Sequence, residues 1–135
     1  MRYMLLMNYA APSHTPDCKP MTEWSPEAVE GLIGFMHDFN AKLQANGELV
    51  GAEGLAGPEA AKIVWSTGDG APVVTDGPFA ESKELLAGYW IVDVETPERA
   101  IEIAAAASEQ PGHDGRPLGV EIEVREIMGA PSPEV

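Results

Sequence analysis

The sequence predicts an α+β fold in which strands and helices follow the order βαββαβ, with a small β-hairpin inserted in the middle. Two segments begin with the same helix start signal, a hydroxyl residue followed by proline and glutamate. The remaining ordered segments are apolar or β-branched and are bounded by glycine, proline and polar residues, as strands usually are. Without the hairpin, this order is the ferredoxin-like pattern, with both helices on one face of an antiparallel sheet.

The first half of the chain contains the first strand and the longer helix. Residues 3–9 form the predicted strand, and the helix begins at Ser25-Pro26-Glu27 and ends at Asn46-Gly47, where glycine can adopt the left-handed cap. Apolar residues spaced three and four apart predict the face that packs on the sheet. They are Val29, Leu32, Met36, Phe39 and Leu43.

The second half supplies the other strands and the second helix. Glycines at 51 and 54 in the next predicted strand, residues 48–55, indicate a bulge or a close approach to the backbone. The predicted elements are a hairpin of residues 61–67 and 71–75 around Gly68-Asp69-Gly70, a strand at 85–94, a helix that starts at Thr96-Pro97-Glu98 and ends before Pro111, and a last strand at 120–128.

Length and charge limit the classes of function. A chain of 135 residues suits one domain, expected at 1–128, followed by a flexible tail at 129–135. Its 22 acidic and 8 basic residues give a net charge of −14, which disfavours binding to nucleic acid or to anionic membranes. The single cysteine, Cys18, excludes an intrachain disulfide. Without a signal peptide or an apolar run of membrane-spanning length, a cytoplasmic protein is expected.

The strand at 85–94 predicts a homodimer. It is apolar at both alternating sets of positions, whereas an antiparallel strand with one wet face should alternate with polar residues. Two helices cannot cover both faces of the sheet, so a second copy of the chain is expected to cover the other one, with a cavity between or beside the sheets. The covered set is either Leu86, Trp90 and Val92 or Leu85, Tyr89 and Ile91.

The connection at residues 76–84 carries more charge than a turn requires. Gly77 and Pro78 restrict its backbone path. Four ionisable residues surround that path, which indicates the floor or lid of a ligand site. They are Asp76, Glu81, Lys83 and Glu84. The predicted pocket residues are Phe79, Glu81, Lys83, Tyr89 and Trp90, although an anchoring role for Phe79 and an exposed ion pair for Lys83 remain alternatives.

Residues 75–84, TDGPFAESKE, resemble the DGPF signature of YCII-related proteins. The opening Tyr3-Met4-Leu5-Leu6, the segment 51–55, the triplet 88–90 and the last strand are similar to that family as well, so the resemblance covers residues 1–128. It implies the dimeric α+β barrel architecture. Relatives in the wider superfamily act on small aromatic or chlorinated compounds without a cofactor, and some DGPF proteins are associated with extracytoplasmic-function sigma factors.

Three residues are candidates for proton transfer. Asp76 could act as a base or ligand clamp, or could cap the turn. Glu53 would be an acid or base if it pointed into a dimer cavity. His37 is suggested by the resemblance, which implies a catalytic histidine paired with aspartate, although helical spacing turns it about 120° from the apolar stripe. The spacing of the histidines predicts no metal site, and no cofactor is expected.

The predicted function is the handling of a small molecule in a pocket beside the 76–84 connection. One form of this hypothesis is a cofactor-independent enzyme that uses acid–base chemistry. The alternative is a small-ligand-binding or regulatory module without catalytic turnover. The resemblance to DGPF proteins suggests that such a module is linked to sigma-factor regulation. A third interpretation is a protein-interaction module, which would need an exposed apolar patch beyond the dimer interface.

Overall fold

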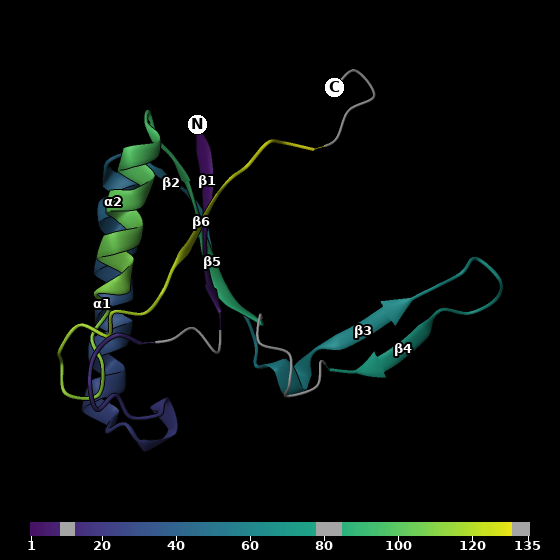
Figure 1. Ribbon diagram of the computed structural model, residues 1–135, viewed down its shortest axis with the longest axis horizontal. Helices are drawn as coiled ribbons and strands as arrows, with labels where there is room; N and C mark the ends of the chain where they lie inside the picture. Colours follow the sequence, from purple (N-terminus) through teal and green to yellow (C-terminus); the bar gives the residue numbers. More distant parts are fainter. Residues whose placement is uncertain (9–12, 78–84, 131–135) are drawn as a thin grey trace.

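The computed structural model describes residues 1–8, 13–77 and 85–130. Two helices lie side by side on one face of a four-stranded antiparallel sheet, and a two-stranded hairpin projects from the opposite side (Figure 1). The elements are β1 Arg2–Asn8, α1 Pro26–Ala45, β2 Leu49–Gly54, β3 Lys62–Trp65, β4 Val73–Asp76, β5 Leu86–Asp93, α2 Pro97–Ser108 and β6 Glu123–Glu126, with short 3-10 helices at Met21–Glu23 and Pro58–Ala60. This arrangement confirms the predicted ferredoxin-like α+β fold.

Both helices begin at the predicted caps. The Ser25 hydroxyl accepts a hydrogen bond from the Ala28 amide at 3.1 Å, and the Thr96 hydroxyl accepts one from the Arg99 amide at 3.2 Å. Beyond the end of α1, Gly47 has a φ of 72°, the left-handed conformation that glycine adopts without steric cost. The local sequence signals therefore set the starts of both helices and the end of α1.

The order of strands in the sheet is β2-β5-β1-β6, which is the ferredoxin-like order. The register of β2 on β5 shifts between Leu49 and Gly51, as the glycine pattern predicted. The last strand is shorter than predicted, since its ladder with β1 covers Glu123–Glu126 alone. Before this ladder the chain leaves the sheet, because Gly119 and Val120 donate their amides to the Ser108 carbonyl instead.

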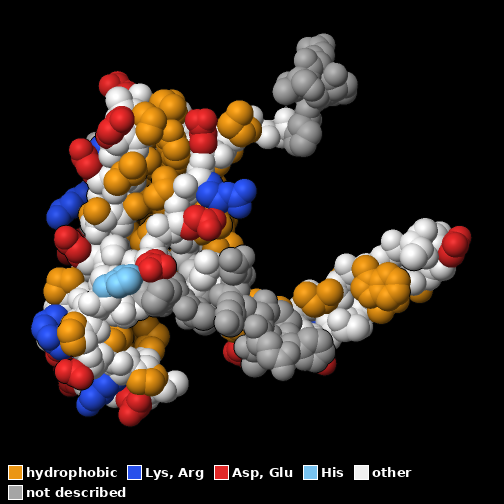
Figure 2. Space-filling model, viewed as in Figure 1, with side chains coloured by type: hydrophobic (Ala, Val, Ile, Leu, Met, Phe, Trp, Pro, Cys, Tyr) orange, Lys and Arg blue, Asp and Glu red, His pale blue; other side chains and the backbone are white. Residues whose placement is uncertain are grey.

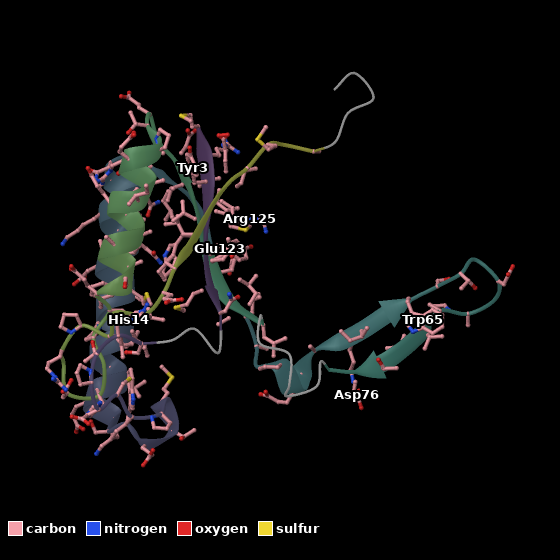
Figure 3. All side chains as sticks on the ribbon, viewed as in Figure 1. Tyr3, His14, Trp65, Asp76, Glu123 and Arg125 are labelled. Atoms are coloured by element: carbon pink, nitrogen blue, oxygen red, sulfur yellow. The ribbon has the colours of Figure 1, made fainter. Side chains whose placement is uncertain are left out.

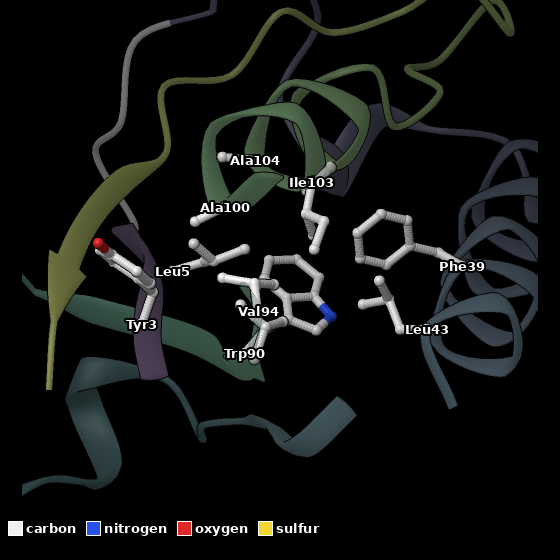
Figure 4. Close-up of a cluster of buried hydrophobic side chains, with 11 residues drawn as sticks. Tyr3, Leu5, Phe39, Leu43, Trp90, Val94, Ala100, Ile103 and Ala104 are labelled. Atoms are coloured by element: carbon white, nitrogen blue, oxygen red, sulfur yellow. The ribbon is translucent and has the colours of Figure 1, made fainter. Parts of the chain in front are cut away.

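The core lies between the sheet and the two helices (Figure 4). Trp90 is at its centre and 5% exposed, and its ring meets the edge of Phe39 with 5.5 Å between centroids. Leu5 and Val92 are fully buried beside it. Tyr3, Leu5, Trp90 and Val92 therefore belong to the helix-covered face.

The other face of the sheet, which we call the open face, is not covered by any helix of the described residues. Its centre consists of Met4 paired with Ile91 and Leu6 paired with Tyr89, all half-buried. Of the two alternating sets considered for β5, the one containing Tyr89 and Ile91 is therefore the set left open. Trp90 belongs to the core, so it cannot lie in an interface between sheets. Glu123 and Arg125 extend the open face on β6, on the side away from the helices (Figure 3).

The hairpin at Lys62–Asp76, which we call the arm, stands apart from the rest of the chain, which we call the body (Figure 1). Gly68 and Gly70 in its turn have φ values of 90° and 91°, as expected for a tight connection. The arm projects on the side of the open face. All eight of its strand residues are exposed.

Candidate functional site

A cavity of about 200 Å³ opens between α1 and the end of the sheet where β2 and β5 pair. Apolar side chains and backbone form most of its wall, and polar side chains are few, which is typical of sites for small molecules. We call it the Asn40 cavity. Its lining residues are Met7, Met36, Asn40, Ala52, Glu53, Gly54, Ala87, Gly88, Tyr89 and Trp90.

The principal polar group on the helix side of this cavity is the Asn40 amide. The Trp90 indole N–H donates to Asn40 Oδ1 at 2.9 Å, and Trp90 is itself held by its edge contact with Phe39. This bond uses the amide oxygen and fixes the side chain. Within the described residues the two Nδ2–H donors of Asn40 have no acceptor, so they remain for a ligand.

Two methionines provide adaptable walls. Met36 lies one helical turn before Asn40, so both side chains project from the same face of α1. Met7 is positioned by Gln110, the 3%-exposed glutamine after α2, whose Nε2 donates to Met7 Sδ at 3.4 Å and to the Ala107 carbonyl at 3.1 Å. Flexible, polarizable thioethers can fit ligands of different shapes.

The floor of the cavity depends on a glycine. Gly88 is buried, and a Cβ at this position would lie 2.9 Å from the Glu53 carbonyl oxygen on the paired strand. Contacts this close do not occur for real Cβ atoms, so β2 and β5 can keep their separation here with glycine alone.

Three of the predicted site residues meet at this cavity. Trp90 lines it and orients Asn40, while Glu53 and Tyr89 are cross-strand neighbours beside it. Glu53 is exposed and lies on the open face of the sheet, so it stands at the rim. A role in proton transfer for Glu53 stays a prediction.

The other predicted residues lie elsewhere. His37 is exposed on α1 and is not part of the cavity wall, as helical spacing suggested. The Asp76 carboxylate is 88% exposed at the base of the arm, where it forms an ion pair with Lys62 across the hairpin (Figure 3). Their catalytic roles stay predictions. Phe79, Glu81 and Lys83 lie outside the described residues.

The first two residues of the DGPF segment secure the base of the arm. Asp76 is joined to Lys62, and the Gly77 amide donates to the Ala61 carbonyl at 2.7 Å. A Cβ on Gly77 would lie 2.7 Å from the Pro58 carbonyl oxygen, so the close packing at this point requires glycine. In this part of the signature, Asp76 and Gly77 therefore hold the base of the hairpin in place.

Sequence reasoning missed Asn40, Met7 and Gln110. A signal for Asn40 was available, because it follows Met36 by four residues and therefore interrupts an apolar row of the helix with an amide. The contact between Gln110 and Met7 joins residues 103 positions apart, and no local pattern indicates it.

A second polar cluster joins α2 to the start of β2. The Arg99 guanidinium donates to both carboxylate oxygens of Glu48, at 2.7 and 2.9 Å, and to Glu102 at 3.1 Å. These hydrogen bonds hold the pKa of the Glu48 carboxyl below its usual value, against the opposite effect of its partial burial. The contact is structural, because it connects two elements of the body away from the Asn40 cavity.

Neither a metal centre nor a membrane span is found in the described part of the chain. Residues 1–8, 13–77 and 85–130 contain no group of three or more His, Cys, Asp and Glu side chains that could hold a metal ion. Within the same ranges, no helix has the length and apolar character needed to cross a bilayer.

Comparison with known proteins assigns the family. The model of the YCII-related domain matches residues 1–112. The chain is also 31% identical over 81 residues to an uncharacterized protein of Rhizobium meliloti (strain 1021). That alignment spans 60% of this chain and 64% of the relative, somewhat less than two thirds of its length. The match over residues 1–112 establishes that the chain belongs to the YCII-related domain family.

Proposed function

We propose that the protein binds a small, largely apolar molecule carrying a hydrogen-bond acceptor, in the Asn40 cavity. The observation that supports this function is the Asn40 amide, which is fixed by Trp90 through its oxygen. Its two N–H donors have no acceptor among the described residues and lie beside an apolar wall. An acceptor on the ligand would pair with those donors. A volume of about 200 Å³ restricts the ligand to a size below that of typical drug molecules.

Binding without turnover is the form of this function that the described residues favour. General acid–base catalysis requires a titratable group held within hydrogen-bond reach of the substrate. Asp76 is exposed on the arm and His37 is exposed on α1, and neither lines the cavity. A regulatory module that senses a small molecule, with a link to sigma-factor regulation, fits this arrangement.

A cofactor-independent enzyme is the second candidate, and the position of Glu53 favours it. Glu53 stands at the cavity rim next to Tyr89, so its carboxylate is near any ligand that extends beyond the cavity. Closure of the rim by a second copy would desolvate Glu53 and adapt it to proton transfer.

We also propose that the protein is a homodimer, joined through the open faces of two sheets as an α+β barrel. The apolar centre formed by Met4, Leu6, Tyr89 and Ile91 supports this assembly, because no helix covers it. The proposed site of action is the cytoplasm, where the exposed thiol of Cys18 stays reduced.

The binding proposal is tested with acetophenone, which has one ring and one carbonyl acceptor, and with ethylbenzene, which lacks the acceptor. Acetophenone is expected to shift the NMR signals of the Trp90 indole N–H and the Asn40 amide group. Asn40→Asp keeps an acceptor for Trp90 but removes both donors. It should weaken acetophenone binding by roughly fivefold or more, since a hydrogen bond contributes about 1 kcal/mol.

The matched control is Gln44→Glu, which makes the same amide-to-acid change at an exposed position of α1. It should bind acetophenone like the wild type, and ethylbenzene binding should differ little among all three proteins. Equal acetophenone affinity in wild type and Asn40→Asp would contradict the proposal. Glu53→Gln separates the two candidate functions: it should leave affinity unchanged in a binding module and abolish turnover in an enzyme.

A further inference from the structure

The arm exposes large apolar side chains on both of its strands. Its large side chains are between 38% and 60% exposed, and they stand on a hairpin that projects away from the body (Figure 2). These side chains are Ile63, Val64, Trp65, Val73 and Val74. Contiguous exposed apolar surface marks a site of interaction.

Both faces of the arm are apolar. Paired residues of an antiparallel ladder share a face, so Val64 and Val74 lie on one side of the arm. Trp65 and Val73 lie on the other. A cover on either face would therefore bury apolar side chains.

An isolated two-stranded hairpin is at best marginally stable in water. The two strands of the arm pair with each other and with no other described strand, so each also has a free edge. Free apolar edges promote unwanted association unless another chain or element covers them. The arm therefore requires a cover in the working protein.

The distribution of charge favours a second copy of this chain as that cover. The chain has a net charge of −14, so two copies repel each other except where contact surfaces lack carboxylates. Between residues 63 and 75 the sequence has one charged residue, Asp69, at the turn. The arm is thus a surface on which this acidic chain can meet a copy of itself, whereas an anionic bilayer would repel the body.

The position of the arm also favours a second copy of the chain as its cover. It projects on the side of the open face (Figure 1), where the partner would stand in the homodimer proposed above. In a twofold dimer the contact of one arm with its partner is repeated by the other arm, so both become covered and neither is left to recruit further copies.

We propose that the arm extends across this dimer and packs against the body of the second copy, with each protomer's arm covered by its partner. The inference depends on the proposed homodimer but makes a separate claim, namely that residues 63–74 are part of the interface. Asp76 and Gly77 then set the direction of the arm, since they secure its base.

The test is the dissociation constant of the dimer, measured by sedimentation velocity over a dilution series. Ile63→Asp and Val64→Asp each place a carboxylate on a different face of the arm. At least one should raise the dissociation constant by roughly 30-fold or more, because the substitution occurs twice in a twofold dimer and buries two charges. Ile33→Asp is the matched control, since Ile33 is 52% exposed on α1, close to the 45% of Ile63. It should leave the constant within about threefold of the wild type.

A second measurement does not depend on a charged substitution in the arm, because its reference variant keeps an aromatic side chain at position 65. Iodide quenching of Trp65, isolated as the difference between wild type and Trp65→Phe, should be weak in the dimer and strong after dilution to monomer. A wild-type dimer whose dissociation constant is unchanged by both arm variants, with Trp65 open to iodide, would overturn the arm contact and leave the open-face dimer standing. A wild type that is monomeric at all concentrations would overturn both.

Discussion

The body and the arm are built from similar residues but depend on different contacts. In the body, Val92 on β5 is fully buried beneath the helices. In the arm, Val64 on β3 is 60% exposed and its strand pairs with one neighbour. The body therefore carries its own stabilisation, whereas the arm keeps its apolar side chains available. The difference supports the proposal that the body is the folding unit and the arm is an element of assembly.

The largest expected effect comes from making one substitution in both regions. Val92→Ala should lower the free energy of unfolding by about 2 kcal/mol, from the lost burial and the cavity left behind. Val64→Ala should change it by less than about 0.5 kcal/mol in the monomer. Urea unfolding of dilute, monomeric protein measures both. Similar losses in the two variants would show that the arm is part of the folding core.

The ion pairs of the two regions should differ in the same direction. Arg99→Met removes the two hydrogen bonds that Arg99 donates to the half-buried Glu48 carboxylate and should cost about 1–2 kcal/mol. Lys62→Met removes the exposed partner of Asp76 and should cost under about 1 kcal/mol. The same urea experiment compares the free energies of unfolding of the two variants. A larger decrease for Lys62→Met would contradict the view that the ion pair of the body contributes more to stability than that of the arm.

A smaller effect should appear in the pH dependence of the body. The pKa of Glu48 in the folded protein lies below its ordinary value of 4.5 because Arg99 donates hydrogen bonds to the carboxylate. Its contribution to stability is therefore complete above about pH 4.5 and is lost as the pH falls through the lower folded-state value. Asp114 responds in the same direction through Arg116, so the comparison of wild type with Arg99→Met isolates Glu48. The free energy of unfolding of Arg99→Met should fall less steeply than that of the wild type as the pH decreases through this range. Identical slopes in the two proteins would contradict the assignment of this pH dependence to Glu48.

The body was largely predictable because local signals agree with its topology. Ser25 and Thr96 accept the cap hydrogen bonds that their positions suggested, and Gly47 has the left-handed conformation expected of it. The hairpin was predicted from Gly68-Asp69-Gly70 as well. Periodicity could not decide which alternating set of β5 faces the helices, because both sets are apolar and a shift of one residue exchanges them.

The candidate site was less accessible from sequence. Glu53, Tyr89 and Trp90 were predicted as site residues, and all three line the Asn40 cavity. Trp90, however, is a buried core residue. Asp76 was singled out for its charge, and its ion pair with Lys62 could not be foreseen without the register of the hairpin. The polar group that gives the cavity its directionality, Asn40, depends on a contact 50 residues away in sequence.

Hydrogen exchange of the backbone amides in β3 and β4, followed against protein concentration, tests the central contrast between body and arm most directly. We predict that amides of β5 keep their protection at every concentration, while those of the arm are protected in the dimer and lose protection on dilution. The same loss is expected in whichever of Ile63→Asp and Val64→Asp raises the dissociation constant of the dimer. Protection of the arm that is independent of concentration, or absent even in concentrated protein, would contradict the account.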